Sequence, residues 1–317
     1  MRSSDMIVPP ANPPLTGRTD PDEGPLALRV HQLVKPFSGD NVELSRVLIG
    51  FRSDEGVRRN QGRLGARDGP IAIRRSIANL GVDSVRVVYD AGDIVCEDER
   101  LEEAQRSLGD VIADITSRGH RAVVVGGGHE VAFGTFLGVT QGLARMKIPK
   151  RRKIAVVNID AHFDIRGGAR STSGTPFAQI LDFADVLGLN VSYFVIGISK
   201  VSNTLALFER ARLYKVCYLL DSEVQSVPKS FLDEIVENFD YIYLSVDFDS
   251  LPGYLMPAVS APASLGVPLG VVEETLATLI DCGKVLAIDF AEFSPCYDIG
   301  MVGERAAARL VFAALFG

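Results

Sequence analysis

Eight short apolar segments alternate with helix-like stretches along most of this 317-residue chain, and this alternation constrains the fold more than any other feature. Several of the eight are rich in β-branched residues and hydrophobic without interruption, as expected for strands that helices cover on both faces. Alternating strands and helices favour right-handed crossovers and a mostly parallel sheet between two helical layers. The predicted strands are Arg46–Phe51, Arg86–Tyr89, Arg121–Val125, Lys153–Ile159, Tyr193–Ile198, Lys215–Leu220, Tyr241–Val246 and Val285–Phe290.

Helices are predicted between these strands, and a proline near the start of three of them suits the first turn of a helix. No fixed-period repeat and no linker divides the chain. We therefore expect one α/β domain at residues 25–317, preceded by a proline-containing arm at residues 1–24. The predicted helices are Pro70–Ala78, Arg100–Ser117, Val131–Gly142, Pro176–Leu187, Asn203–Ala211, Pro228–Asn238, Val271–Cys282 and Glu304–Phe316.

The composition is that of an ordinary globular protein, with 47% hydrophobic and 23% charged residues. The net charge of −7 gives a nucleic-acid partner no electrostatic footprint. No apolar stretch is long enough to span a membrane, and the first residues lack the apolar core of a signal peptide. The four cysteines are far apart and form no CxxC pair, so a zinc cluster is not indicated. We expect a cytoplasmic protein.

Three short segments with acidic and histidine side chains each follow one of the predicted strands. They are Gly126-Gly127-Gly128-His129-Glu130, Asp160-Ala161-His162-Phe163-Asp164 and Asp247-Phe248-Asp249. Side chains two residues apart in an extended chain point the same way. The carboxyl ends of parallel strands meet at one rim, where α/β proteins bind their ligands. We therefore expect six side chains to converge there: His129, Asp160, His162, Asp164, Asp247 and Asp249.

Four carboxylates this close together would repel one another unless cations cancelled their charge. Carboxylate and imidazole ligands without a thiolate favour a borderline-hard ion such as Mn²⁺ over a structural zinc. Two ions that share carboxylates bind a water between them and deprotonate it near neutral pH. The sequence thus predicts a two-metal hydrolytic centre, with a hydroxide poised to attack an electrophilic carbon or phosphorus.

Each segment also has a simpler interpretation when it is taken alone. An Asp-X-Asp pair at a strand end commonly caps a loop or forms half of a salt bridge. A triple glycine can cradle a phosphate, but the dinucleotide-binding pattern requires glycine at position 131, where this chain has Val131. The coincidence of all three segments at strand ends favours the metal site. Glu292 follows the last predicted strand and either holds a cationic amidine or guanidine at the same rim or is a structural acid.

These motifs resemble, in order, those of the ureohydrolase family, which includes the arginases, agmatinases and formimidoylglutamases. The match extends from Arg46 to the end of the chain. The resemblance implies a three-layer α/β sandwich on an eight-stranded, mostly parallel sheet, two manganese ions per subunit, and a trimer or hexamer. It also implies that His129 and Asp164 bind one ion, that His162 and Asp249 bind the other, and that Asp160 and Asp247 bridge the pair.

Within the family, the flanking sequence is most similar to the formimidoylglutamases. The supporting stretches are Thr16-Gly17-Arg18, His31-Gln32, Asp54-Glu55-Gly56-Val57-Arg58-Arg59-Asn60, Gly65-Ala66-Arg67-Asp68-Gly69-Pro70, Asp164-Ile165-Arg166, Ser173-Gly174-Thr175-Pro176-Phe177 and Val259-Ser260-Ala261-Pro262. In the family that these motifs resemble, arginases and agmatinases carry a histidine, credited with shuttling protons, at the position of Phe177. Its absence argues against an arginase and leaves the proton donor for the leaving group unassigned.

The substrate implied is N-formimidoyl-L-glutamate, an amidine with two carboxylates, and the implied products are L-glutamate and formamide. Glu292 and Asp160 are the expected catalytic residues, Glu292 by holding the cationic end and Asp160 as a bridging ligand. Arginine binds carboxylates in bidentate fashion, and Arg67 and Arg166 lie in loops near the proposed rim. The expected substrate-binding residues are therefore Arg67, Arg166, Asn60 and Glu292, although either arginine has the alternative of a surface residue or a partner of a structural acid.

Two other functions remain open from the sequence. One is hydrolysis of a guanidine substrate such as agmatine or guanidinobutyrate, which the two arginines and Phe177 disfavour. The other, from a different class, is a catalytically silent metal-binding or scaffold protein. A degenerate protein of that kind is expected to have lost at least one of the six ligands, and all six are present here.

Overall fold

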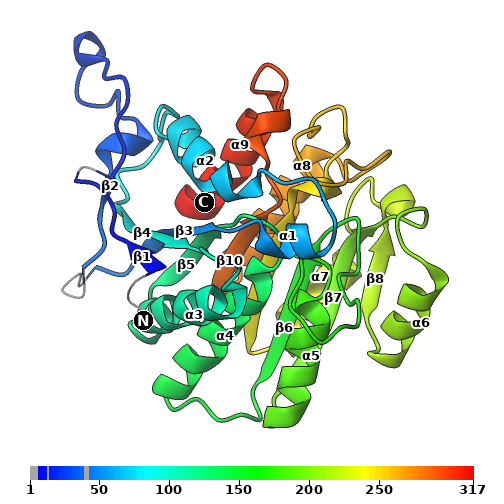
Figure 1. The fold of residues 1–317 in the computed structure, drawn as a ribbon. Coiled ribbons are helices and arrows are strands. Elements are labelled where there is room, and N and C mark those ends of the chain that lie inside the picture. The colour runs from blue at the N-terminus through cyan, green and yellow to red at the C-terminus, as the bar shows by residue number, and fades with distance from the viewer. Residues whose placement is uncertain (1–5, 13, 39–42) are drawn as a thin grey trace.

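One sheet runs through the middle of the molecule, as Figure 1 shows for the computed structural model, which describes residues 6–12, 14–38 and 43–317. Among these residues the sheet has ten strands. The order is β1-β4-β3-β5-β10-β9-β6-β7-β8, and β2 pairs with β4 outside this path. Every pair is parallel except β1 with β4. The strands are β1 (Ile7–Val8), β2 (Val34–Pro36), β3 (Arg46–Arg52), β4 (Val88–Val95), β5 (Arg121–Val125), β6 (Lys153–Ile159), β7 (Asn190–Ile198), β8 (Cys217–Leu220), β9 (Tyr241–Asp247) and β10 (Val285–Ala291).

All eight predicted strands are present, but the expected count of eight is wrong because β1 and β2 extend the sheet to ten. The two extra strands cover two and three residues. Strands this short carry no hydrophobic periodicity that a sequence pattern can detect. The boundaries of β4 are also wrong: it begins at Val88 and continues to Val95. The part of β4 after Tyr89 carries Asp90 and Asp93, which interrupt the apolar pattern.

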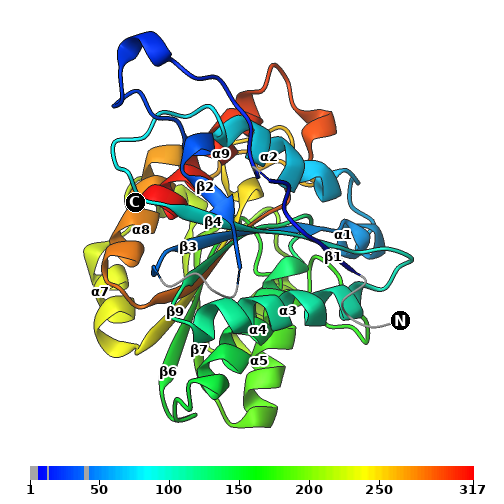
Figure 2. The same cartoon turned by 90° about the vertical axis from the view of Figure 1, so that its left-hand side faces the viewer.

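Helices cover both faces of the sheet, so the three-layer sandwich is confirmed (Figures 1 and 2). One apolar layer joins the sheet to α2, α7, α8 and α9, and the other joins it to α3, α4, α5 and α6. Among the described residues, no helix has the length and apolar character needed to cross a bilayer. The helices are α1 (Glu55–Arg59), α2 (Gly69–Ile77), α3 (Leu101–Ser117), α4 (Val131–Arg145), α5 (Pro176–Leu187), α6 (Leu205–Leu213), α7 (Lys229–Asn238), α8 (Leu269–Asp281) and α9 (Val302–Phe316). Only the short α1 was not predicted.

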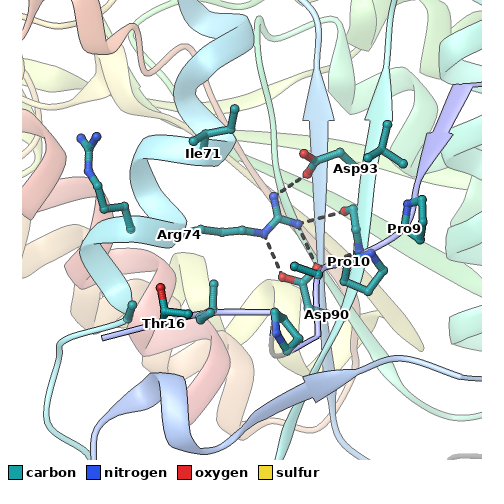
Figure 3. Close-up of a pocket in the computed structure, with 14 residues that line it drawn as sticks. Pro9, Pro10, Thr16, Ile71, Arg74, Asp90 and Asp93 are labelled. Atoms are coloured by element: carbon teal, nitrogen blue, oxygen red, sulfur yellow. Dashed lines mark hydrogen bonds and ion pairs between the residues drawn. The ribbon is translucent and has the colours of Figure 1, made fainter. Parts of the chain in front are cut away.

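The described part of the N-terminal segment lies against the β4 edge of the sheet. Gly92 has a φ of +83°, and a Cβ on it would lie 2.1 Å from the backbone oxygen of Val8, so this close approach requires glycine. Beside it, a cavity of about 310 Å³ separates the segment from α2. Figure 3 shows Arg74 of α2 reaching into this region and binding Asp90 and Asp93. Residues 1–5 and 13 of the expected arm lie outside the described residues, and the division at residue 24 stays a prediction.

Parallel strands bring their carboxyl ends to a common rim. The four central strands of the sheet are neighbours in the order β5-β10-β9-β6, and β5, β6 and β9 precede the three acidic and histidine segments. The register aligns Ala291 of β10 with Asp247 of β9, and Ile159 of β6 with Val246. The topology therefore places the predicted ligands side by side.

Candidate metal centre

The structure brings all six predicted ligands together at this rim. Their ligand atoms form two groups, and within each group all the atoms lie within 4.8 Å of one another. Asp160 belongs to both groups, as expected of a bridging carboxylate, whereas Asp247 is found in the first group only. The first group is His129, Asp160, Asp164 and Asp247, and the second is Asp160, His162 and Asp249.

The triple glycine positions His129 by close backbone packing. Gly126 N donates to Phe290 O at 2.6 Å, and Gly128 N donates to Ser53 O at 2.9 Å, which ties the loop after β5 to β10 and β3. A Cβ on Gly127 would lie 1.6 Å from Ser53 O, closer than any side chain tolerates. The glycines are therefore explained by the approach of three strand ends and not by a phosphate.

A chain of hydrogen bonds fixes which nitrogen of His129 faces the carboxylates. The Ser245 hydroxyl lies 2.5 Å from Asp289 Oδ1 and donates to it. Ser245 Oγ must then accept from His129 Nε2, which is 2.9 Å away. In the neutral ring, which carries one proton and is the form that binds a metal, His129 Nδ1 is then left with its lone pair.

That lone pair points at acceptors alone. His129 Nδ1 is buried without a hydrogen-bond donor and lies 3.0 to 3.3 Å from carboxylate oxygens of Asp160, Asp164 and Asp247. Burial lowers the pKa of His129, but the surrounding carboxylates, Asp247 first, raise it well above its ordinary value, so Nδ1 attracts a proton when no metal cation takes that position. A cation at this point would satisfy the ring and the three carboxylates together, so the residues present fit a metal ion.

The second group has the same character. His162 Nδ1 lies 2.9 Å from Asp249 Oδ2 and 3.6 Å from Asp160 Oδ1. Asp160 is fully buried, and it accepts from the His162 backbone N–H at 2.6 Å and from Asn158 Nδ2 at 2.8 Å. Burial raises the pKa of Asp249 to about 6, although the nearby His162 opposes this. A dication between these groups would hold the carboxylates ionised.

A cavity of about 240 Å³ opens directly onto the two groups. Asn60, Arg166 and Glu292, all predicted to bind substrate, line it. Arg166 is exposed at its mouth, and Asn60 Nδ2 donates to Ser173 Oγ at 3.1 Å. The lining comprises Asn60, Gly62, His162, Asp164, Arg166, Ser173, Leu207, Asp247, Asp249, Ser260, Ala261 and Glu292.

Arg67 does not line this cavity, in contrast to the sequence prediction. It belongs to a short 3₁₀ turn, Ala66–Asp68, that leads into α2. The flanking glycines place this turn against the loop after β10, since a Cβ on Gly65 would meet Cys296 Sγ and one on Gly69 would meet Phe293 O. The turn thus packs against the residues that follow Glu292, and Arg166, but not Arg67, lines the candidate site.

Glu292 has an unusual backbone and a half-satisfied carboxylate. Its φ is +74°, a left-handed conformation that costs a non-glycine residue energy and clusters at functional sites. Glu292 Oε1 accepts from the His129 backbone N–H at 2.9 Å, whereas Oε2 is buried and has no hydrogen-bond partner. Burial, followed by the charge of Glu130, raises the pKa of Glu292 to about 8. A cationic group in the cavity would satisfy the free oxygen.

Phe177 lies in the core and not in the cavity. Its side chain is fully buried, and it stacks on Tyr193 with ring centroids 4.6 Å apart. It also meets the His129 ring edge-on at 5.3 Å. Phe177 therefore contacts a predicted metal ligand but does not line the cavity. Ser173, four residues earlier, is the member of this segment that lines the cavity.

Sequence reasoning missed the residues that support the ligands. Ser245 and Asp289 are register partners on β9 and β10, and Asn158 lies two residues before Asp160 on β6. All three are fully buried polar residues within apolar strands. Such a residue needs an internal partner, so each interruption of an apolar run was a signal that could have identified them.

Comparison with known proteins agrees with this geometry. A family model described as the arginase family matches residues 45–317. A protein of Rhodococcus jostii named formimidoylglutamase is 43% identical over 310 residues, which cover 96% of this chain and 95% of the relative. A protein of the same name from Chromobacterium violaceum is 42% identical over 302 residues, covering 94% of this chain and 96% of that one.

Solved structures give the same picture. A crystal structure of Trypanosoma cruzi formiminoglutamase with Mn²⁺ superimposes with a TM-score of 0.79 and 27% identity, over 92% of this chain and 98% of the other. The formimidoylglutamase of Bacillus subtilis has a TM-score of 0.80 over 95% of this chain and 93% of its own, and at 22% identity it indicates the shared fold alone.

Proposed function

Since the chain belongs to the arginase family, we propose that it is a manganese-dependent hydrolase that cleaves N-formimidoyl-L-glutamate to L-glutamate and formamide. The observation that carries this proposal is the convergence of two histidines and four aspartates beneath one polar cavity. The names of relatives at 42–43% identity support the choice of substrate within the family.

Each of the two groups of ligands would hold one manganese ion. His129 and Asp164 would bind the first ion and His162 and Asp249 the second, while Asp160, which belongs to both groups, and Asp247 are the carboxylates that the two ions would share. When bound, the ions supply a hydroxide nucleophile near neutral pH and stabilise the negative charge that develops on attack. Hydrogen bonds from neighbouring buried residues fix the orientation of the ligands: the Ser245–Asp289 pair orients His129, and Asn158 orients Asp160.

The cavity binds the two ends of the substrate by opposite charges. Glu292 Oε2, buried without a partner, accepts from the amidinium group and holds its carbon over the metal centre. At the mouth, the exposed Arg166 guanidinium binds a carboxylate of the glutamate part. Asn60 and Ser173 line the same cavity and supply neutral hydrogen-bond donors.

A product assay tests the proposal. The manganese-loaded protein is incubated separately with N-formimidoyl-L-glutamate, agmatine and guanidinobutyrate, and formamide and urea are quantified. We expect formamide from the first substrate and little urea from the others. Preferential release of urea would assign a guanidine substrate instead, and no product from any of the three would favour a silent relative. A trimer or hexamer and a cytoplasmic location stay predictions, which gel filtration and cell fractionation test.

A further inference from the structure

Three arginines gather at the end of the sheet opposite the metal centre. Arg46 and Arg121 are the first residues of β3 and β5, and they are direct partners in the parallel register. Arg86 lies two residues before β4, the neighbour of β3 on its other side. Since the metal ligands follow the carboxyl ends of strands, these arginines are separated from them by the length of β5, roughly 15 Å for five residues.

No acidic side chain of the described residues forms an ion pair with this cluster, although Asp281 acts on Arg121 from farther away. Among the described residues, no Asp or Glu lies within 4.0 Å of the guanidinium nitrogens of Arg46, Arg86 or Arg121. Like charges directly opposite one another on paired strands are destabilising. Burial, followed by repulsion from Arg121 and Arg86, lowers the pKa of Arg46 to about 10.

Backbone oxygens satisfy only part of the cluster. Arg46 Nη2 and Arg86 Nη1 each donate to an oxygen of Gly317, both at 2.8 Å, at the end of α9. Arg121 Nε donates to Val285 O at 3.1 Å. Arg46 Nε and Arg121 Nη1 remain buried without an acceptor. A buried donor that lacks an acceptor costs the full desolvation of that group.

A cavity of about 260 Å³ opens at this same end of the sheet. Arg46 and Arg121 line it together with Ser45, Thr116 and His120, next to the apolar side chains of Leu44 and Met146. We propose that this cavity is a binding site for a small oxyanion, such as sulfate, phosphate or a carboxylate, held by Arg46 and Arg121. A planar guanidinium matches the oxygens of such anions in bidentate fashion. This site is independent of the proposed reaction.

Thermal unfolding of the manganese-loaded protein tests the site. The midpoint is measured against sodium sulfate, with sodium chloride at equal ionic strength as the reference. We expect a rise of several degrees that saturates in the millimolar range, because an anion that binds the folded state alone stabilises it. Phosphate and acetate series then distinguish a tetrahedral anion from a carboxylate.

Two variants locate the effect. Arg121→Gln removes the buried donor and should abolish the saturable rise, whereas Arg106→Gln, which removes an exposed charge on α3, should keep it. If Arg121→Gln does not fold, Arg121→Lys takes its place. This variant keeps the positive charge but loses the planar guanidinium, and it should weaken sulfate binding at least tenfold. The proposal is overturned if sulfate stabilises no more than chloride, or if the Arg121 variant that folds saturates as the wild type does.

Discussion

His129 Nε2 lies 2.9 Å from Ser245 Oγ, and this one hydrogen bond decides which nitrogen of the ring is available to a metal. The Ser245 hydroxyl donates to Asp289, which is buried and also accepts from Tyr243 at 2.6 Å. Ser245 of β9 and Asp289 of β10 therefore orient His129, which follows β5. Support of this kind is commonly as important to a metal site as the ligands themselves.

Replacement of Ser245 by alanine should weaken manganese binding by about 10- to 100-fold, because His129 loses the acceptor that fixes its tautomer. The measurement is the manganese concentration needed for half-maximal activity after removal of metal by a chelator. Ser226→Ala, in an exposed loop, provides the control and should behave as the wild type. Equal activation of both variants would show that Ser245 does not orient the ligand.

Substitutions of Arg166 and Arg67 provide a matched test of which arginine binds the substrate. Arg166→Met should raise KM for N-formimidoyl-L-glutamate by about 10- to 100-fold, since a hydrogen bond to a charged group contributes about 1.5–3 kcal/mol. Arg67→Met should leave KM unchanged, because Arg67 does not line the cavity. Steady-state kinetics decides between them, and a larger effect from Arg67 would contradict the placement.

Gly127 should tolerate no side chain. A Cβ there would lie 1.6 Å from Ser53 O, so Gly127→Ala must displace the end of β3 or the loop that carries His129. We expect a loss of about 3 kcal/mol or more in the free energy of unfolding, together with lower activity. Gly270→Ala is the control: it lies in α8 with open space around it, and it should stabilise the helix by about 0.5–1 kcal/mol. Denaturant titration measures both, and similar values would refute the packing argument.

Asp247 is the last residue of β9 and belongs to the first group of ligands, together with His129. Asp247→Ala should reduce formamide production below detection, since it removes a carboxylate that the proposed centre shares between two ions. Circular dichroism checks that the variant is folded. Full turnover of this variant with manganese would rule out a role for Asp247 in the centre.

Most of the fold and the six ligands could be predicted because both depend on local patterns. Apolar runs such as Ile154–Ile159 identify buried strands, and the ligands follow directly from where those strands end. The two-residue strand at Ile7 could not be predicted, because its pairing depends on the backbone of Gly92, far along the chain. The side-chain environment of Phe177 depends on helix packing, which sequence spacing does not encode.

The residues that support the ligands could not be predicted for a different reason. Ser245 and Asp289 meet only because β9 and β10 are neighbours in the sheet, although 44 positions separate them. Arg67 and Arg166 were indistinguishable in the sequence, since each is a loop arginine near the rim. Only the packing of the turn at Ala66–Asp68 separates them.

The most direct test of the two-metal centre is a manganese titration of the chelator-treated protein, with bound metal and formamide release measured on the same samples. We expect two ions per chain, with formamide release from N-formimidoyl-L-glutamate rising as the second ion binds and falling again when the chelator is restored. Full formamide release with the metal removed, or saturation at one ion per chain with full activity, would contradict the two-metal centre.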